Sequence, residues 1–293
     1  MMLSGGYLIY KPKGLTSRRV DNILGKLLRM KRIGHIGTLD PLAEGLLPVL
    51  VGTATRIAPF VDNNIKGYKV RITLGTGTTT DDSEGDVIES KPVQVPASRI
   101  IENLKAFLGE IDQVPPKFSA KKIDGVPMYK RARRNEEVVV QPKKVIVYSI
   151  DDVHIALPDV SFSIICGTGT YLRAIARDLG HRLGCGGYLS ALIRTSVGNH
   201  NVSDAADFEE VIQSIKSDNS DKFLKSELDM LPHLPKIQVG QIEAWKVQQG
   251  QILFGLASKI KTAQLFLIVS NDNELLAVSE KTPGGYKYKR VLA

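Results

Sequence analysis

One short loop of this chain holds an aspartate whose surroundings suit a catalytic carboxylate. Asp40 follows Gly37, directly precedes Pro41, and has His35 five residues upstream. Pro41 lacks a backbone N–H and disfavours helical dihedral angles at Asp40, so the aspartate is expected to be held extended at a rigid corner. A carboxylate fixed in this way suits nucleophilic or general-base work, because little freedom remains to be lost on reaction.

The same residues also allow a purely structural interpretation. An Asp-Pro pair in a glycine-rich loop is usually a turn, with the Asp oxygen bonded to nearby backbone N–H groups. Taken alone, the loop favours that interpretation. The apolar run Leu46–Val51 follows it, which predicts that the loop lies on the edge of a packed core.

Further motifs accompany this loop in a fixed order, from residue 11 to about residue 197. In that order and spacing the chain resembles the TruB-type tRNA pseudouridine synthases, which isomerise uridine 55 in the T-loop of tRNA. The resemblance implies a reaction that needs no cofactor and no metal. The motifs are Lys11–Ser17, Gly34–Ala43, Lys66–Tyr68, Pro115–Lys122, Gly169–Arg173, Gly184–Gly186 and Leu192–Thr195.

The resemblance also implies a role for each matching residue. Asp40 would be the catalytic carboxylate, Tyr68 would stack on the target base, and Arg173 would pair with Asp40. Three roles of Asp40 stay open: attack at C6 of the uracil, attack at C1′ of the ribose, or removal of a sugar proton to give a glycal. The residues expected to bind the substrate are Lys11, His35, Tyr171 and Leu192, with Lys121, Lys130, Arg131, Arg133 and Arg134 on backbone phosphates.

Ordinary structural alternatives accompany these roles. Tyr68 would otherwise be a strand tyrosine at a core edge, and Leu192 a core residue. His35, which in the family inserts into the space left by the flipped nucleotide, would otherwise belong to a turn. Arg177, one helical turn beyond Arg173, is expected to be the solvated arginine of its helix.

Charge is distributed unevenly along the chain, whose net charge is +8. Residues 117–144 hold nine Lys or Arg and three acidic residues, a local charge of +6, whereas residues 200–235 hold three Lys and eight acidic residues, a local charge of −5. We interpret residues 113–143 as an extended basic arm that binds RNA phosphates. The alternative is a solvated, charge-rich segment without a partner.

The apolar patterns predict an α/β (α+β) fold with a mixed, mostly antiparallel central sheet flanked by helices and loops. Residues 1–233 are expected to form the catalytic domain. Residues 234–293 are expected to form a small C-terminal β-barrel-like domain, which the resemblance implies is PUA-like. The expected elements are a helix capped by Thr16 or Ser17, strand 68–74, helix 96–108, strands 144–155 and 160–166, a helix that starts from a tight turn at Gly167–Thr170 and is ended by Gly184 after Leu183, and C-terminal strands 265–269, 274–279 and 286–291.

Composition excludes several other classes of protein. The chain has no apolar run near the roughly 20 residues that span a bilayer, and its two cysteines lack zinc-site spacing. We expect a cytoplasmic monomer that binds the T-arm of tRNA without an obligate protein partner. Two competing hypotheses are an RNA-binding module with a structural Asp40 loop, and a guide-RNA-directed relative of the same family.

Overall fold

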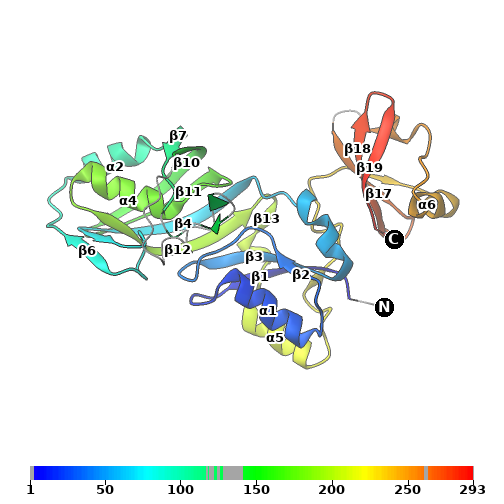
Figure 1. Ribbon diagram of the computed structural model, residues 1–293, viewed down its shortest axis with the longest axis horizontal. Coiled ribbons are helices and arrows are strands. Elements are labelled where there is room, and N and C mark those ends of the chain that lie inside the picture. Colours follow the sequence, from blue (N-terminus) through cyan, green and yellow to red (C-terminus); the bar gives the residue numbers. More distant parts are fainter. Residues whose placement is uncertain are drawn as a thin grey trace.

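The chain folds into a large mixed sheet with helices packed on it, and a smaller C-terminal sheet to one side (Figure 1). The structure is a computed structural model that describes residues 3–116, 118, 122–123, 126–127, 141–260 and 263–292. Among these residues, no helix is long and apolar enough to cross a membrane.

The large sheet has eleven strands, and most neighbouring strands in it run antiparallel. Parallel pairs occur only twice in its described ladders, between β1 and β14 and between β3 and β12. The expected mixed, mostly antiparallel fold is therefore confirmed. The strands in pairing order are β14 (Ala206–Asp207), β1 (Gly5–Lys11), β3 (Glu44–Val51), β12 (Gly187–Val197), β4 (Ile65–Leu74), β11 (Asp159–Gly167), β10 (Lys143–Ala156) and β7 (Gly109–Gln113), with β15 (Leu224–Lys225) on β1, β2 (Ile33–His35) on β3 and β13 (His200–Asn201) on β12.

Strand β12 positions the site because it lies between β3 and β4. Its residue Arg194 pairs with Gly45 of β3 on one side and with Tyr68 of β4 on the other. The Asp40 loop joins β2 to β3, so this pairing brings the loop beside Tyr68 although 28 residues separate them in the sequence.

Helices contact one another in pairs against the large sheet: α1 with α5, and α2 with α4 (Figure 1). Thr16 caps α1 by accepting the N–H of Arg19 at 3.0 Å, as the sequence predicts. Gly184 ends α4 in the left-handed region, with φ of 78°. The helices are α1 (Ser17–Leu27), α2 (Ala97–Lys105), α4 (Leu172–Leu183), α5 (Phe208–Lys216) and α6 (Gln241–Gln248), with 3₁₀ turns η1 (Gly52–Phe60), η2 (Val202–Asp204) and η3 (Leu256–Lys259).

One helix start agrees with the sequence prediction, and one helix end differs from it. α4 begins at Leu172, after the expected tight turn at Gly167–Thr170, in which Thr170 Oγ1 donates to the Gly167 carbonyl and Gly169 has a φ of 89°. α2 ends at Lys105 rather than at residue 108. Beyond it, the side chain of Leu108 is exposed instead of facing inward.

The start of the predicted basic arm also differs from expectation. Gln113, Pro115 and Pro116 are buried, so this stretch is part of the packed protein rather than an extended arm. Short strands β8 (Lys122–Ile123) and β9 (Val126–Pro127) pair further on. The predicted phosphate-binding residues Lys121, Lys130, Arg131, Arg133 and Arg134 lie outside the described residues.

The C-terminal part forms a four-stranded sheet to one side of the large one (Figure 1). Its order is β16-β17-β18-β19, with β16 parallel to β17 and the other pairs antiparallel. Leu267, Val269 and Val278 share one apolar cluster with Leu46 and Leu50 of β3. Closure into a barrel and the boundary at residue 234 stay predictions. The strands are β16 (Lys236–Gln238), β17 (Leu265–Val269), β18 (Leu275–Thr282) and β19 (Gly285–Val291).

Candidate active site

The loop that carries Asp40 is held from the side by helix α1. Ser17 is fully buried, and its Oγ accepts the N–H of Leu39 at 2.8 Å while donating to the Leu39 carbonyl at 3.1 Å. The Pro41 carbonyl accepts the N–H of Gly14 at 2.7 Å. These bonds fix the residues on either side of Asp40, so its carboxylate projects from an anchored backbone.

Arg194 of β12 binds the backbone of the same loop and of the strand that follows it. Its side chain is fully buried, and its guanidinium donates to the carbonyls of Leu46 at 2.8 Å, Gly37 at 3.0 Å and Thr38 at 3.4 Å. Gly37 has a φ of 70°, and a Cβ there would lie 2.9 Å from Asn63 Oδ1. The positive φ favours glycine at this turn, and any other residue would also have to displace the Asn63 side chain.

Replacing Arg194 with methionine should destabilise the protein by about 3 kcal/mol, because the carbonyls of Leu46, Gly37 and Thr38 would lose their donor. We expect a lower midpoint in urea denaturation with an unchanged slope. Arg99→Met, on the exposed face of α2, is the matched control and should leave the midpoint in place. Equal midpoints for the two variants would show that Arg194 does not hold the loop.

Arg173 of α4 meets the carboxylate of Asp40. Its Nη2 lies 2.9 Å from Asp40 Oδ2 and also donates to the Phe118 carbonyl at 2.9 Å. Nη1 donates to the Thr80 carbonyl at 3.2 Å and lies 3.6 Å from Asp82 Oδ2. The Arg173 side chain is 7% exposed and that of Asp40 is 43% exposed. A nearly buried cation thus orients a carboxylate that solvent can reach.

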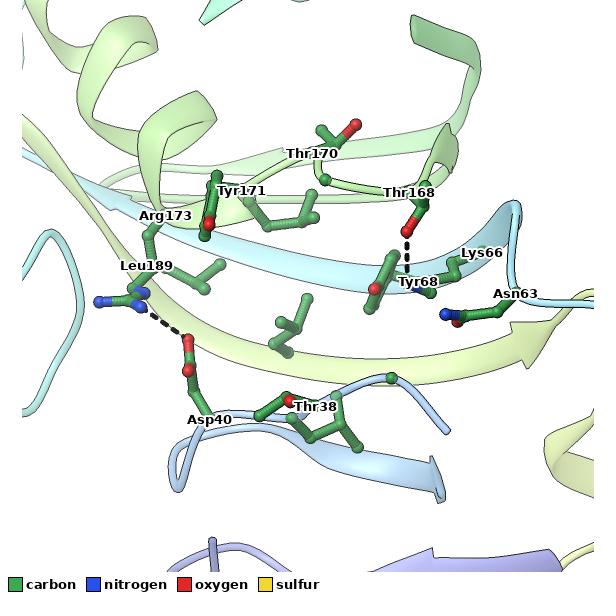
Figure 2. Close-up of a pocket in the computed structure, with 15 residues that line it drawn as sticks. Thr38, Asp40, Asn63, Lys66, Tyr68, Thr168, Thr170, Tyr171, Arg173 and Leu189 are labelled. Carbon is green, nitrogen blue, oxygen red and sulfur yellow. Dashed lines mark hydrogen bonds and ion pairs between the residues drawn. The ribbon is translucent and has the colours of Figure 1, made fainter. Parts of the chain in front are cut away.

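The carboxylate opens onto a pocket whose walls come from four separate segments of the chain (Figure 2). Tyr68 lies between the Asp40–Arg173 pair and a second polar group formed by Asn63, Lys66 and Thr168. The lining residues are Gly37, Thr38, Leu39, Asp40, Asn63, Lys66, Tyr68, Thr168, Gly169, Thr170, Tyr171, Leu172, Arg173, Leu189 and Leu192.

Burial shapes the chemistry of Tyr68 and Lys66. Burial raises the pKa of Tyr68 to about 12, against the opposing effect of the nearby Arg194 guanidinium, so its phenol is neutral at physiological pH. Burial also lowers the pKa of Lys66 to about 8, and Arg194 adds to that effect. The Lys66 amine donates to Thr168 Oγ1 at 3.1 Å. The pocket therefore contains a neutral phenol and a lysine whose pKa is lower than that of an exposed lysine.

The structure brings five of the sequence-derived site residues together at this pocket: Asp40, Tyr68, Tyr171, Arg173 and Leu192. His35 is outside the lining, because its Nδ1 lies 2.8 Å from Asp21 Oδ2 and its Nε2 lies 3.4 Å from Thr38 Oγ1. Its ring flanks the Asp40 loop.

Two expectations are corrected. Lys11 was expected to bind substrate, but its side chain is fully buried and its ammonium donates to the carbonyls of Pro12 at 2.8 Å and Leu15 at 2.6 Å. These hydrogen bonds stabilise the turn before α1 instead. Arg177 was expected to be solvated, but its side chain is 20% exposed and pairs with Asp81 and Asp178.

Four residues around the pocket received no individual role from the sequence: Asp82, Gln113, Arg194 and Lys66. Asp82 is 3% exposed and follows a run of Thr79, Thr80 and Asp81 that looks like an ordinary polar loop. Its side chain is buried because the loop folds back on β12, where Asp82 bridges to Leu189. In the described part of the chain, no group of three or more His, Cys, Asp or Glu side chains could hold a metal ion.

Comparison with known proteins agrees with this geometry. Residues 25–172 match the model of the TruB family pseudouridylate synthase (N-terminal domain), and residues 173–231 match the tRNA pseudouridylate synthase B C-terminal domain. The chain therefore belongs to the TruB family of pseudouridylate synthases, which are isomerases.

Individual relatives extend the match over the whole chain. The chain is 36% identical to tRNA pseudouridine synthase B of Geotalea uraniireducens, over 97% of this chain and 94% of that protein. It is 35% identical to the protein of the same name from Bacillus anthracis, over 99% of this chain and 97% of that protein. A solved Cbf5-Nop10-Gar1 complex contains a chain with a TM-score of 0.73 and 25% identity, covering 99% of this chain and 85% of that one.

Proposed function

We propose that this protein converts uridine 55 in the T-loop of tRNA to pseudouridine, with Asp40 as the catalytic carboxylate. The observation that carries the proposal is the placement of Asp40. Its carboxylate is fixed against Arg173 at 2.9 Å, at a pocket with Tyr68 between its two polar ends. Its relatives are named tRNA pseudouridine synthase B, which supports tRNA as the substrate.

The reaction breaks the N1–C1′ bond of uridine, turns the uracil, and joins C5 to C1′. The net change is an isomerisation: C5 loses its proton when it bonds to C1′, and N1 gains a proton after its bond to C1′ is broken. The uridine must leave its base stack to reach Asp40, and a flat aromatic ring such as Tyr68 compensates for the lost stacking. Arg173 holds the carboxylate in place, aimed at the glycosidic bond. The phenol of Tyr68, neutral in its buried position, is available to relay the C5 proton.

The site of modification can be tested by mapping pseudouridine in an unmodified tRNA transcript after incubation with the pure protein. We expect a single modified position, uridine 55, and no product in a transcript that carries cytidine there. Modification of a different uridine would contradict the proposed substrate position while leaving the class of reaction intact.

The basic segment 117–144 is proposed to bind backbone phosphates of the same RNA. Neutralising Lys130, Arg131, Arg133 and Arg134 together should weaken RNA binding. It should also make the negative slope of log affinity against log salt concentration shallower, by up to about 3 units. Single-turnover chemistry on bound RNA should change little. Neutralising the exposed Lys216, Lys222 and Lys225 in the acidic part of the chain is the control. Equal slopes for both variants would show that the basic segment does not contact the RNA.

A second candidate is a guide-RNA-directed enzyme that works with protein partners. The fold likeness to Cbf5 in complex with Nop10 and Gar1 favours it. The higher identity to proteins named tRNA pseudouridine synthase B favours a stand-alone enzyme that acts as a monomer. Turnover of bare tRNA by the isolated chain, with no guide RNA added, would decide for the stand-alone enzyme. If Asp40→Ala remained active, the Asp40 loop would have only a structural role, and Asp40 would not be the catalytic carboxylate.

A further inference from the structure

The side chain of Gln113 is bound to the backbone of a pocket residue at two points. Gln113 ends β7 and is 2% exposed. Its Oε1 accepts the N–H of Tyr171 at 2.8 Å, and its Nε2 donates to the Tyr171 carbonyl at 3.2 Å. Because both bonds come from one planar amide, they fix the orientation of the Tyr171 backbone as well as its position.

Tyr171 is the point where the pocket wall becomes helix α4. It is the residue before the first helical position, with φ of −102° and ψ of 111°, and no side chain caps the helix there. Its carbonyl also accepts the N–H of Ile175 at 3.2 Å, the first bond of the helix. The amide of Gln113 therefore sets where α4 begins, two residues before Arg173.

The end of β7 is itself held against α4. Arg177 donates from Nη2 to the Val114 carbonyl at 2.9 Å, and its Nη1 lies 3.2 Å from Asp81 Oδ2. Arg173 lies one helical turn before Arg177, on the same face, and donates to the Phe118 carbonyl. The chain just after Gln113 is thus attached to α4 at two further points, both beyond the contact with Tyr171.

We infer that Gln113 is a positioning residue for the isomerisation, acting through Tyr171 to place the start of α4 so that Arg173 meets Asp40. This inference rests on the proposed function. A displacement of about 1 Å in a catalytic group is enough to slow a reaction about 100-fold.

Gln113→Leu tests the inference, because leucine is similar in size to glutamine but is apolar, so the substitution removes both hydrogen bonds. We expect faster hydrogen exchange at the Tyr171 amide and a single-turnover rate of tritium release that is about 10- to 100-fold lower. The dissociation constant for RNA should stay within about threefold. Gln213→Leu, on the exposed face of α5, is the matched control and should change neither quantity.

Gln113→Glu supplies a readout that a merely structural role would not give. An ionised carboxylate still accepts the Tyr171 N–H but repels the Tyr171 carbonyl. When protonated, its O–H donates to that carbonyl and restores the pair, and burial raises the pKa of a carboxyl group. The rate of this variant relative to wild type should therefore increase as the pH falls from about 8 to about 6.

Three results would overturn the inference: unchanged exchange at Tyr171 in Gln113→Leu, a wild-type rate in that variant, or a pH-independent rate ratio in Gln113→Glu. If Gln113→Leu does not fold, the pH dependence of Gln113→Glu decides alone. If the wild type releases no tritium, the proposed function fails, and exchange at Tyr171 still decides whether Gln113 holds that residue.

Discussion

Asp40→Asn should lower the single-turnover rate by more than about 10,000-fold and leave the affinity for tRNA within about twofold of wild type. Asparagine matches aspartate in size but carries no charge, so it is unable to act as nucleophile or base. The backbone on either side of residue 40 is held by Ser17 and Arg194 rather than by the Asp40 side chain, so the loop should keep its shape. Rapid-quench tritium release measures the rate, and filter binding measures the affinity.

Asp112→Asn is the control for this variant, because Asp112 is an exposed aspartate of β7. It should have the wild-type rate and affinity. A loss of RNA binding by Asp40→Asn that equals its loss of rate would show that Asp40 is a structural or binding residue. Substantial turnover by Asp40→Asn would remove the carboxylate from the chemistry.

Arg173→Met should lower the single-turnover rate by about 100- to 1,000-fold, the usual effect of removing one preorganised charged donor from an active site. The guanidinium bonds the carbonyls of Thr80 and Phe118 while it pairs with Asp40, and no apolar side chain can replace these contacts. Arg173→Lys should restore only part of the rate, because one ammonium cannot reproduce the planar fork of donors.

Arg182→Met, on the exposed face of the same helix, controls for the loss of a positive charge on α4. Its rate should match that of the wild type. If Arg173→Met were as active as Arg182→Met, the ion pair with Asp40 would have no part in the reaction. If instead its RNA affinity fell as far as its rate, Arg173 would be a substrate-binding residue.

Local signals in the sequence were sufficient for the elements that position the site. The cap at Thr16 and the left-handed stop at Gly184 both follow from residue type alone, and both are confirmed. The apolar run Leu46–Val51 lies within β3, at the core edge beside the Asp40 loop, as predicted. The pairing of Arg173 with Asp40 came from the resemblance to the TruB-type synthases rather than from a local signal, and the two side chains lie 2.9 Å apart.

The residues that the sequence did not reveal act across long separations. Arg194 bonds carbonyls 148 to 157 residues away, and the Gln113 amide bonds a backbone 58 residues away. No local pattern in the sequence distinguishes these side chains from surface ones. Their partners are distant backbone groups, which every residue has, so no residue type marks them. The error at Arg177 also comes from a distant contact, since its burial depends on Asp81 and on the folded-back loop that carries it.

The most direct test of the account is tritium release from T-arm RNA labelled with 5-³H-uridine, using the purified wild-type chain alone. The account predicts that one equivalent of tritium is released for each RNA modified, with no guide RNA or partner protein present. Tight binding of the same RNA without any release of tritium would contradict it, and would identify the protein as an RNA-binding module or as an enzyme for another RNA.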